Sequence, residues 1–250
     1  MKTLKFIGMA LFAILMCVNF TSCSKDDHIT TKGKKLTKIV RNDDYGEYTY
    51  LLNFDKKRRL IGVKEINNKK KTDSYYSYIW NNNTIIGYNN SYVCNIEKGL
   101  IKNINEINGE YNETFLYDDS KKIINYIWEA PEYNESTSTP FIWENEKLTE
   151  LYLWYNGNCQ TNYTFSYDGI FCKKGCFHPF ILVLTEDFWM NDFFLNLVHP
   201  ELLGIQTTQL PTKMSSRDDR DYVFEYEFDK DGYVSKIIKN NFDTYTLTWE

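Results

Sequence analysis

Glu225 and Glu227 have the spacing that best suits catalysis in this chain. They stand two positions apart in an alternating segment, so on a strand they would share one face, about 7 Å apart. Two carboxylates at such a separation could serve glycoside hydrolysis. The alternative is a solvated strand face. We favour this alternative for the two glutamates. The sequence also has no Gly-rich phosphate loop, nucleophile elbow or metal-binding helix, and we predict no catalytic residues.

Four cysteines follow the N-terminal segment: Cys94, Cys159, Cys172 and Cys176. In an exported chain this even number allows two disulfides. Cys172 and Cys176 could close a small hairpin loop, which would leave Cys94 to pair with Cys159. The alternative is that the thiols stay reduced.

Two groups of residues resemble parts of metal sites. Cys172, Cys176 and His178 are of the types that bind zinc, but a fourth ligand at a suitable spacing is not visible. The segment DKDG at 229–232 resembles part of a calcium loop, yet Ile238 stands where the bidentate glutamate would be. A hairpin turn explains that segment better. We therefore expect no metal and no cofactor.

Aromatic side chains could also form a binding surface. Tryptophans that lie in or beside strands could stack on sugar rings if they are exposed, whereas core packing would make most of them inaccessible. We favour core packing, and we expect His178 and His199, each followed by proline, to have loop or packing roles. The tryptophans concerned are Trp80, Trp128, Trp143, Trp154 and Trp249.

The N-terminal residues have the features of an export signal. Lys2 and Lys5 precede an apolar stretch at 6–20, as in the positive and hydrophobic regions of a secretory leader. The sequence FTSC at 20–23 resembles the lipobox of bacterial lipoproteins, in which the leader is cut before the cysteine and the thiol takes a diacylglycerol. The alternative is an export signal without lipidation. We predict a signal peptide over 1–22, with Cys23 lipidated.

A short acidic tract follows this cysteine. Lys25, Asp26 and Asp27 resemble the tract that directs lipoproteins of the Bacteroidetes type to the outer face of the outer membrane. We expect display on the cell surface, with the periplasmic leaflet as the alternative. Residues 23–35 are polar and lack periodicity, so they are interpreted as a flexible tether before a single domain over 36–250.

Composition excludes several classes of protein. The chain of 250 residues has a formal net charge of −5, which argues against a nucleic-acid partner. Its 17% aromatic content argues against disorder. After the leader the sequence has no apolar run of about 18 residues, so no helical membrane span is expected.

Alternation of period two dominates from residue 36 onward, as in 48–54, 161–167, 222–228 and 244–249. Such segments are strands with one buried, aromatic-rich face and one wetter face. An aromatic residue followed by an acid or Asn, then a turn and an apolar residue, recurs along the chain and predicts hairpins. We expect about 14 to 18 strands in a curved antiparallel meander or partial barrel.

Two segments differ from this pattern. Residues 185–199 have apolar side chains at helical spacing behind an acidic first turn, and Pro200 ends the run. This predicts one amphipathic helix that covers the sheet. Residues 206–220 are polar and are expected to form a long exposed loop.

Together, the leader, the lipobox, the hairpin repeats and the aromatic–Asp turns resemble an uncharacterised family of Bacteroidetes lipoproteins, a domain of unknown function with a porin-like β-fold. The resemblance implies the same fold and brings no catalytic residues. Polar residues on the second face of many strands argue against lipid contact by the sheet. We expect a non-enzymatic, lipid-anchored envelope protein whose partners are the membrane and a glycan or host ligand. The alternatives are a glycan-acting hydrolase and a purely structural or adhesive surface protein.

Overall fold

The computed structural model describes residues 33–250 except 45, 88, 173–192, 206–207 and 218–220. The chain divides into a unit of residues 1–30 and a unit of residues 31–250. The signal peptide, Cys23 and the tract at 25–27 lie outside the described residues, as do Cys176 and His178.

The described residues of this unit are nearly all β, as predicted. They form a sheet of seventeen antiparallel strands that follow one another in chain order. The strands are β1 Leu36–Asp43, β2 Gly46–Phe54, β3 Leu60–Asn67, β4 Thr72–Ser77, β5 Ile79–Trp80, β6 Thr84–Gly87, β7 Tyr92–Glu97, β8 Leu100–Glu106, β9 Asn112–Tyr117, β10 Ile123–Ala130, β11 Glu135–Glu144, β12 Lys147–Tyr155, β13 Asn158–Ser166, β14 Lys213–Ser216, β15 Tyr222–Phe228, β16 Val234–Lys239 and β17 Asp243–Trp249.

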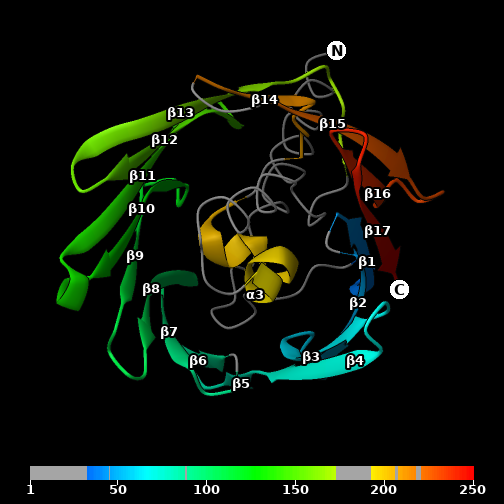
Figure 1. Ribbon diagram of the computed structural model, residues 1–250, viewed down its shortest axis with the longest axis horizontal. Helices are drawn as coiled ribbons and strands as arrows, with labels where there is room; N and C mark the ends of the chain where they lie inside the picture. Colours follow the sequence, from blue (N-terminus) through cyan, green and yellow to red (C-terminus); the bar gives the residue numbers. More distant parts are fainter. Residues whose placement is uncertain (1–32, 45, 88, 173–192, 206–207, 218–220) are drawn as a thin grey trace, which may run out of the picture. The chain divides into compact units, whose positions relative to one another are not determined.

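Pairing between the first and last strands turns this meander into a nearly closed, barrel-like ring (Figure 1). The register of β1 on β17 runs from Leu36 opposite Trp249 to Asn42 opposite Thr244. The run of paired strands is interrupted between β4 and β5. Strand β4 pairs with β3, and β5 pairs with β6. Closure satisfies the backbone groups that open sheet edges would expose. We call the end where Leu36 lies the near end and the opposite end the far end.

A repeated turn explains the aromatic–acid pattern of the sequence. At three near-end hairpins an aspartate accepts backbone N–H groups through its side chain: Asp55 from residues 57 and 59, Asp118 from residue 122, and Asp229 from residues 231 and 233. These bonds replace a regular ladder at the tip of the hairpin. The fourth turn residue has positive φ each time: Arg58, Lys121 and Gly232.

Three near-end tryptophans, of which Trp80 and Trp143 belong to the repeat, fasten neighbouring strands together. The indole Nε1–H groups of Trp80, Trp143 and Trp249 donate to the backbone carbonyls of Leu60, Ile123 and Val234 at 2.6, 2.6 and 2.7 Å. Each acceptor is the first residue of a strand, one hairpin earlier in the chain. A buried indole needs such a partner, and a strand end has a carbonyl to offer.

A short helical segment lies inside the ring (Figure 1). It consists of helix α3, Phe193–Val198, and the 3₁₀ turn η2, Pro200–Leu203. On one side the Phe194 ring packs 5.0 Å from Tyr50 and 5.8 Å from Tyr76. On the other, the hydroxyl of Tyr117 in β9, which donates to the carbonyl of Ile101 at 2.7 Å, lies 3.4 Å from the carbonyl oxygen of Leu202. The predicted covering helix is therefore confirmed from residue 193, while residues 185–192 lie outside the described part.

His199 and Gly204 hold residues 193–204, which we call the plug, against the ring. His199 is buried, and its Nε2 accepts the N–H of Leu60 at 3.3 Å, which confirms its packing role. Gly204 has φ +68 and lies so close to the β9–β10 turn that a Cβ there would be 2.1 Å from the carbonyl oxygen of Lys121. Only glycine fits this approach.

Two expectations for the polar segments need correction. The predicted loop at 206–220 contains β14, because Met214 is fully buried while its neighbours pair with β13 and β15. Residues 33–35, assigned to the tether, contact the ring: Lys35 exchanges backbone hydrogen bonds with Glu250, and Arg58 donates to the carbonyl of Gly33. Within the described residues, no helix has the length and apolar character needed to cross a membrane.

Candidate functional site

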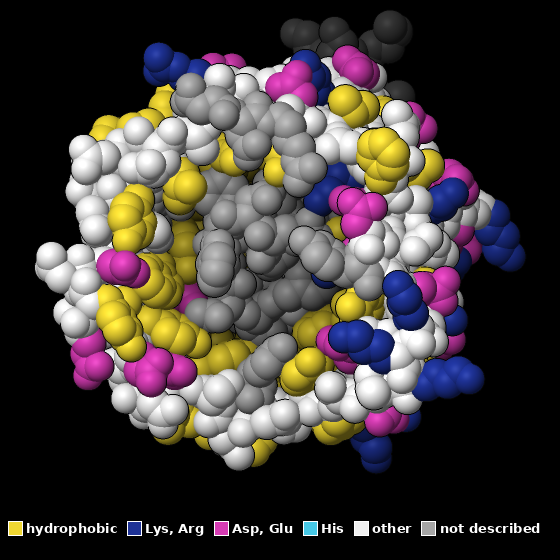
Figure 2. Space-filling view, viewed as in Figure 1, with side chains coloured by type: hydrophobic (Ala, Val, Ile, Leu, Met, Phe, Trp, Pro, Cys, Tyr) yellow, Lys and Arg dark blue, Asp and Glu magenta, His cyan; other side chains and the backbone are white. Residues whose placement is uncertain are grey.

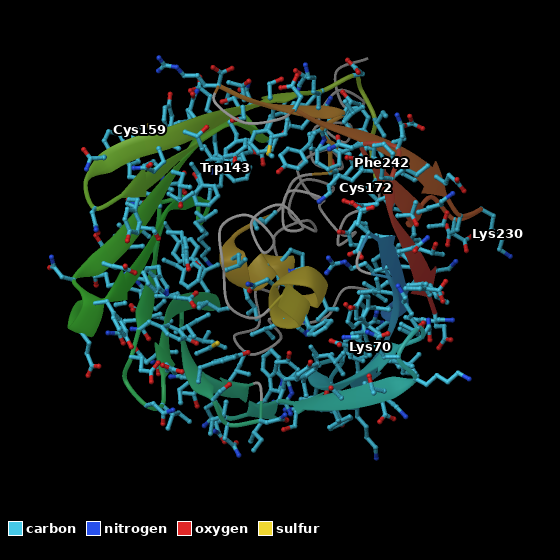
Figure 3. All side chains as sticks on the ribbon, viewed as in Figure 1. Lys70, Trp143, Cys159, Cys172, Lys230 and Phe242 are labelled. Atoms are coloured by element: carbon cyan, nitrogen blue, oxygen red, sulfur yellow. The ribbon has the colours of Figure 1, made fainter. Side chains whose placement is uncertain are left out.

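Of the two possibilities left open for Cys94 and Cys159, a disulfide or reduced thiols, the structure has the reduced thiols. Both thiols are free; Cys94 is fully buried in β7, whereas Cys159 is exposed on β13 (Figure 3). Alternation in β7 points the Cys94 side chain into the core, whereas the Cys159 side chain is exposed to solvent. The other predicted pair cannot be compared, because Cys176 lies outside the described residues.

The carboxylate pair of β15 lies on an exposed face. Glu225 and Glu227 alternate with buried or half-buried Phe224 and Tyr226. Glu227 binds the Lys236 ammonium at 2.9 Å. The geometry is that of a solvated strand face with a cross-strand ion pair, the interpretation that the sequence favoured.

Aspartates of the β15–β16 turn hold a lysine. Asp229 and Asp231 bind the Lys34 ammonium at 2.7 and 2.6 Å, and the backbone N–H of Lys34 donates to the Tyr233 hydroxyl. The Lys34 ammonium lowers the pKa of Asp229 to about 2. The hairpin interpretation of this segment is confirmed, and among the described residues no cluster of His, Cys, Asp or Glu could hold a metal ion.

Four of the five tryptophans pack against the core: Trp80, Trp128, Trp143 and Trp249. Trp143 lies on the inner side of the ribbon in Figure 3. Trp154 is 37% exposed. Core packing therefore explains most of these residues, as predicted.

A different set of inward-facing residues forms the candidate site. We call it the polar wall: Tyr92 of β7, Glu106 of β8, Glu113 of β9, Tyr126 of β10 and Thr139 of β11. Strand alternation puts them on the same face as core residues such as Ile104 and Phe115. Register brings neighbours together, since Tyr92 lies opposite Glu106 and Tyr126 opposite Thr139.

Several polar atoms of this wall are buried without completing a hydrogen bond. Among the described residues this holds for the hydroxyls of Tyr92, Tyr126 and Thr139 and for one carboxylate oxygen, Oε2, of Glu106. The three hydroxyl-bearing side chains are at most 2% exposed. Each such atom costs about 1–3 kcal/mol relative to a bonded one. Buried polar groups of this kind call for a partner such as ordered water or a ligand.

Glu113 is a buried acid that contributes to the electrostatics of the wall. It is fully buried, and its charge adds to the effect of burial in raising the pKa of the Cys94 thiol and of the Tyr126 hydroxyl. Tyr126 faces this carboxylate, yet its hydroxyl does not reach full hydrogen-bond geometry with a described residue. Burial, followed by the charges of Glu106, Glu113 and Glu110, raises the pKa of Tyr111 to about 12. Negative potential thus converges on this part of the ring.

Aromatic rings border the polar wall at the far end. Tyr111 and Trp128 are half-buried and stack with centroids 6.5 Å apart and planes at 27°. Seen down the ring, the β9–β11 side has acidic and hydrophobic side chains with few Lys or Arg, whereas the side of β16, β17 and β1–β4 has Lys and Arg mixed with acids (Figure 2). The far end of β8–β11 therefore combines acids with aromatic faces.

The amino-acid sequence contains one signal for this wall, which the motifs considered above do not include. In the segment NETFLY at 112–117, Glu113 alternates in phase with Phe115 and Tyr117, so it occupies a core-facing position. An acid in phase with buried aromatics is a local conflict of the kind found at functional sites. Sequence alone could not show that β7, β8, β10 and β11 bring further polar groups beside it.

A shallow recess on the outer face of the β3–β4 hairpin is a weaker candidate. Its volume is about 320 Å³, and Lys64, Asn67, Lys71 and Asp73 are among its lining residues. The ammonium of Lys64 binds Asp73 at 2.8 Å, so these opposite charges compensate each other. This recess has no buried polar group that needs a ligand.

Comparison with known proteins identifies the fold. The chain matches no family model and no curated protein. It does match a porin-like protein from Bacteroides uniformis with a TM-score of 0.64 and 14% identity, over 89% of this chain and 99% of that one. A porin-like protein from Bacteroides vulgatus matches with a TM-score of 0.62 and 14% identity, over 87% and 99%. The fold is that of these porin-like proteins.

Proposed function

We propose that this chain is a non-enzymatic, lipid-anchored protein of the cell envelope that binds a ligand, with a glycan as the favoured class, at the polar wall. The observation that carries the binding function is the group of buried, unsatisfied polar atoms on β7, β8, β10 and β11. A protein that used the sheet only for structure would be expected to bury apolar residues there. The stacked rings of Tyr111 and Trp128 supply the flat apolar faces on which sugars stack.

The proposed location rests on the N-terminal sequence. The leader at 1–22, Cys23 and the acidic tract at 25–27 support export, acylation and display on the cell surface. Three acyl chains would give firm anchoring, because each buried methylene contributes about 0.8 kcal/mol. The porin-like fold of two Bacteroides proteins is compatible with an envelope protein.

A glycan array tests the binding function. The full chain in detergent should bind at least one glycan, and Trp128→Ala should weaken that binding roughly tenfold, which corresponds to about 1.4 kcal/mol, because it removes one of the two stacked rings. Trp154→Ala, which removes a tryptophan outside the polar wall, is the matched control and should bind normally. Absence of binding to every glycan would favour the purely structural or adhesive alternative.

Fatty-acid labelling tests the anchor separately. Cells given a labelled fatty acid should incorporate it into the wild-type protein and lose incorporation in Cys23→Ala. Cys17→Ala, a cysteine inside the predicted leader, should retain the label. Equal labelling of wild type and Cys23→Ala would remove the anchor, and protection of the chain from external protease on intact cells would place it in the periplasm.

A further inference from the structure

The strands of the polar wall contain acids but almost no bases. β7, β9, β10 and β11 have no Lys, Arg or His, and the one base of β8, Lys102, is exposed. From residue 103 to residue 172 the chain has three basic residues, Lys121, Lys122 and Lys147, and all three stand at or beside near-end turns. The far half of these strands therefore has no positive charge of its own to balance Glu106.

The charge of a fitting ligand follows from this composition. A carboxylate oxygen that is buried and unbonded, as Oε2 of Glu106 is, is stabilised most by a cationic donor. The charges of Glu106, Glu110 and Glu113 all act at Tyr111 and give the region a negative potential. An anionic ligand would be repelled there, and a neutral one would leave the carboxylate without its best partner.

The remaining atoms define the rest of the ligand. The hydroxyls of Tyr92, Tyr126 and Thr139 can each donate and accept a hydrogen bond, so they suit a partner with hydroxyl groups. The Tyr92 ring is held in place because it lies across Gly87, where a Cβ would be 2.3 Å from the hydroxyl oxygen. The Tyr111–Trp128 stack can hold a cation or an apolar sugar face.

We propose that the polar wall binds an organic ammonium ligand that also has hydroxyl groups, an amino sugar in its simplest form. The ammonium group meets Glu106, with Glu113 adding to the field, and the sugar hydroxyls meet Tyr92, Tyr126 and Thr139. This proposal rests on the proposed binding function and adds that the ligand is positively charged.

Calorimetric titration of the detergent-solubilised full chain tests this proposal with three sugars of the same ring shape. Glucosamine should bind at pH 6, and glucose and N-acetylglucosamine, which lack the charge, should bind about tenfold more weakly or not at all. Glu106→Gln should weaken glucosamine binding by a similar factor. Glu132→Gln removes an exposed acid at the same end of the ring and should leave binding unchanged.

A measurement on the unaltered protein guards against variants that fail to fold. Glucosamine binding should weaken about tenfold between pH 6 and pH 9.5, as the ligand's ammonium group loses its proton. Equal binding of glucose and glucosamine would overturn the charge inference while leaving glycan binding in place. Binding that is equally strong at both pH values, or equally lost in Glu106→Gln and Glu132→Gln, would also overturn it.

Discussion

Two walls of the same ring treat their inward-facing polar groups differently. In the wall made by β1–β4, Arg41 pairs with Asp43, and the Tyr76 hydroxyl donates to Glu65 at 3.2 Å. This wall also receives the plug, because Phe194 packs on Tyr50 and Tyr76. In the polar wall, by contrast, described hydroxyls and a carboxylate oxygen are buried without a completed hydrogen bond.

The contrast separates packing from binding within one architecture. Both walls follow the same two-residue alternation and the same hairpin connections, so the backbone does not explain the difference. The charged residues explain the difference. Strand β1 contains the base Arg41 next to its partner Asp43, whereas β9, β10 and β11 contain acids but no bases. The β1–β4 wall has its own counter-charge, whereas the described strands of the polar wall offer no base to the buried carboxylate oxygen of Glu106, which is why we assign that role to a ligand.

The largest effect that could break this comparison is loss of the plug's contact with the β1–β4 wall. Phe194→Ala removes a buried ring between Tyr50 and Tyr76 and should lower the free energy of unfolding by about 3–5 kcal/mol. Phe242→Ala removes a ring that is 75% exposed and should change it by less than about 0.5 kcal/mol. Urea denaturation measures both, and a loss below about 1 kcal/mol for Phe194→Ala would contradict its structural role.

A smaller effect should follow from changing the contact between the plug and the β9–β10 turn. Gly204→Ala adds strain at positive φ and a Cβ 2.1 Å from the Lys121 carbonyl, so it should cost about 3 kcal/mol. Gly157→Ala introduces the same kind of backbone strain, because Gly157 has φ +76, but its new Cβ would have no atom within 4 Å. This substitution should cost about 1–2 kcal/mol. The difference between the two urea midpoints isolates the contact. Equal losses would mean that the plug is not held against this turn.

Replacing a threonine by valine should have opposite effects on stability in the polar wall and at a site where the hydroxyl is hydrogen-bonded. Thr139→Val replaces an unsatisfied, fully buried hydroxyl by a methyl group and should stabilise the protein by about 1 kcal/mol. Thr161→Val removes a hydroxyl that bonds Ser216 at 2.9 Å and should destabilise it by about 1 kcal/mol. Thermal unfolding without ligand gives both signs. Destabilisation by Thr139→Val would show that this hydroxyl has a partner in the free protein.

Most of the fold was accessible from the sequence because it depends on local rules. Alternating aromatics predicted the strands, and the Asp55, Asp118 and Asp229 turns predicted the hairpins, because one side chain satisfies the turn's own backbone. The role of the repeat's aromatic residue was not accessible. Its indole reaches a carbonyl one hairpin earlier, as Trp143 reaches Ile123, and that contact exists only once strands are paired.

The candidate site could not be derived in the same way, because it depends on register. Tyr92 meets Glu106, and Tyr126 meets Thr139, only through cross-strand pairing over several hairpins. The Cys94–Cys159 bridge, which the cysteine count allowed, does not form for a related reason. An even number of cysteines says nothing about the face of the sheet on which each one lies, and here one is buried and the other exposed.

The smallest expected effect concerns the reactivity of these two cysteines, and it tests the potential inside the polar wall. Burial, with a contribution from Glu113, raises the pKa of the Cys94 thiol well above its usual range. The folded state therefore favours the protonated thiol, so the associated stability is present below the ordinary thiol pKa of about 8.5 and is lost as pH rises above it.

Because the thiolate is the reactive form, iodoacetamide at pH 8 should modify Cys159 in the folded chain and leave Cys94 unmodified. Peptide mapping separates the two sites, and unfolding in urea should make them equally reactive. Glu113→Gln should increase labelling of Cys94 only slightly, since burial is the larger cause and remains; labelling as fast as that of Cys159 would mean that solvent reaches the interior of this wall.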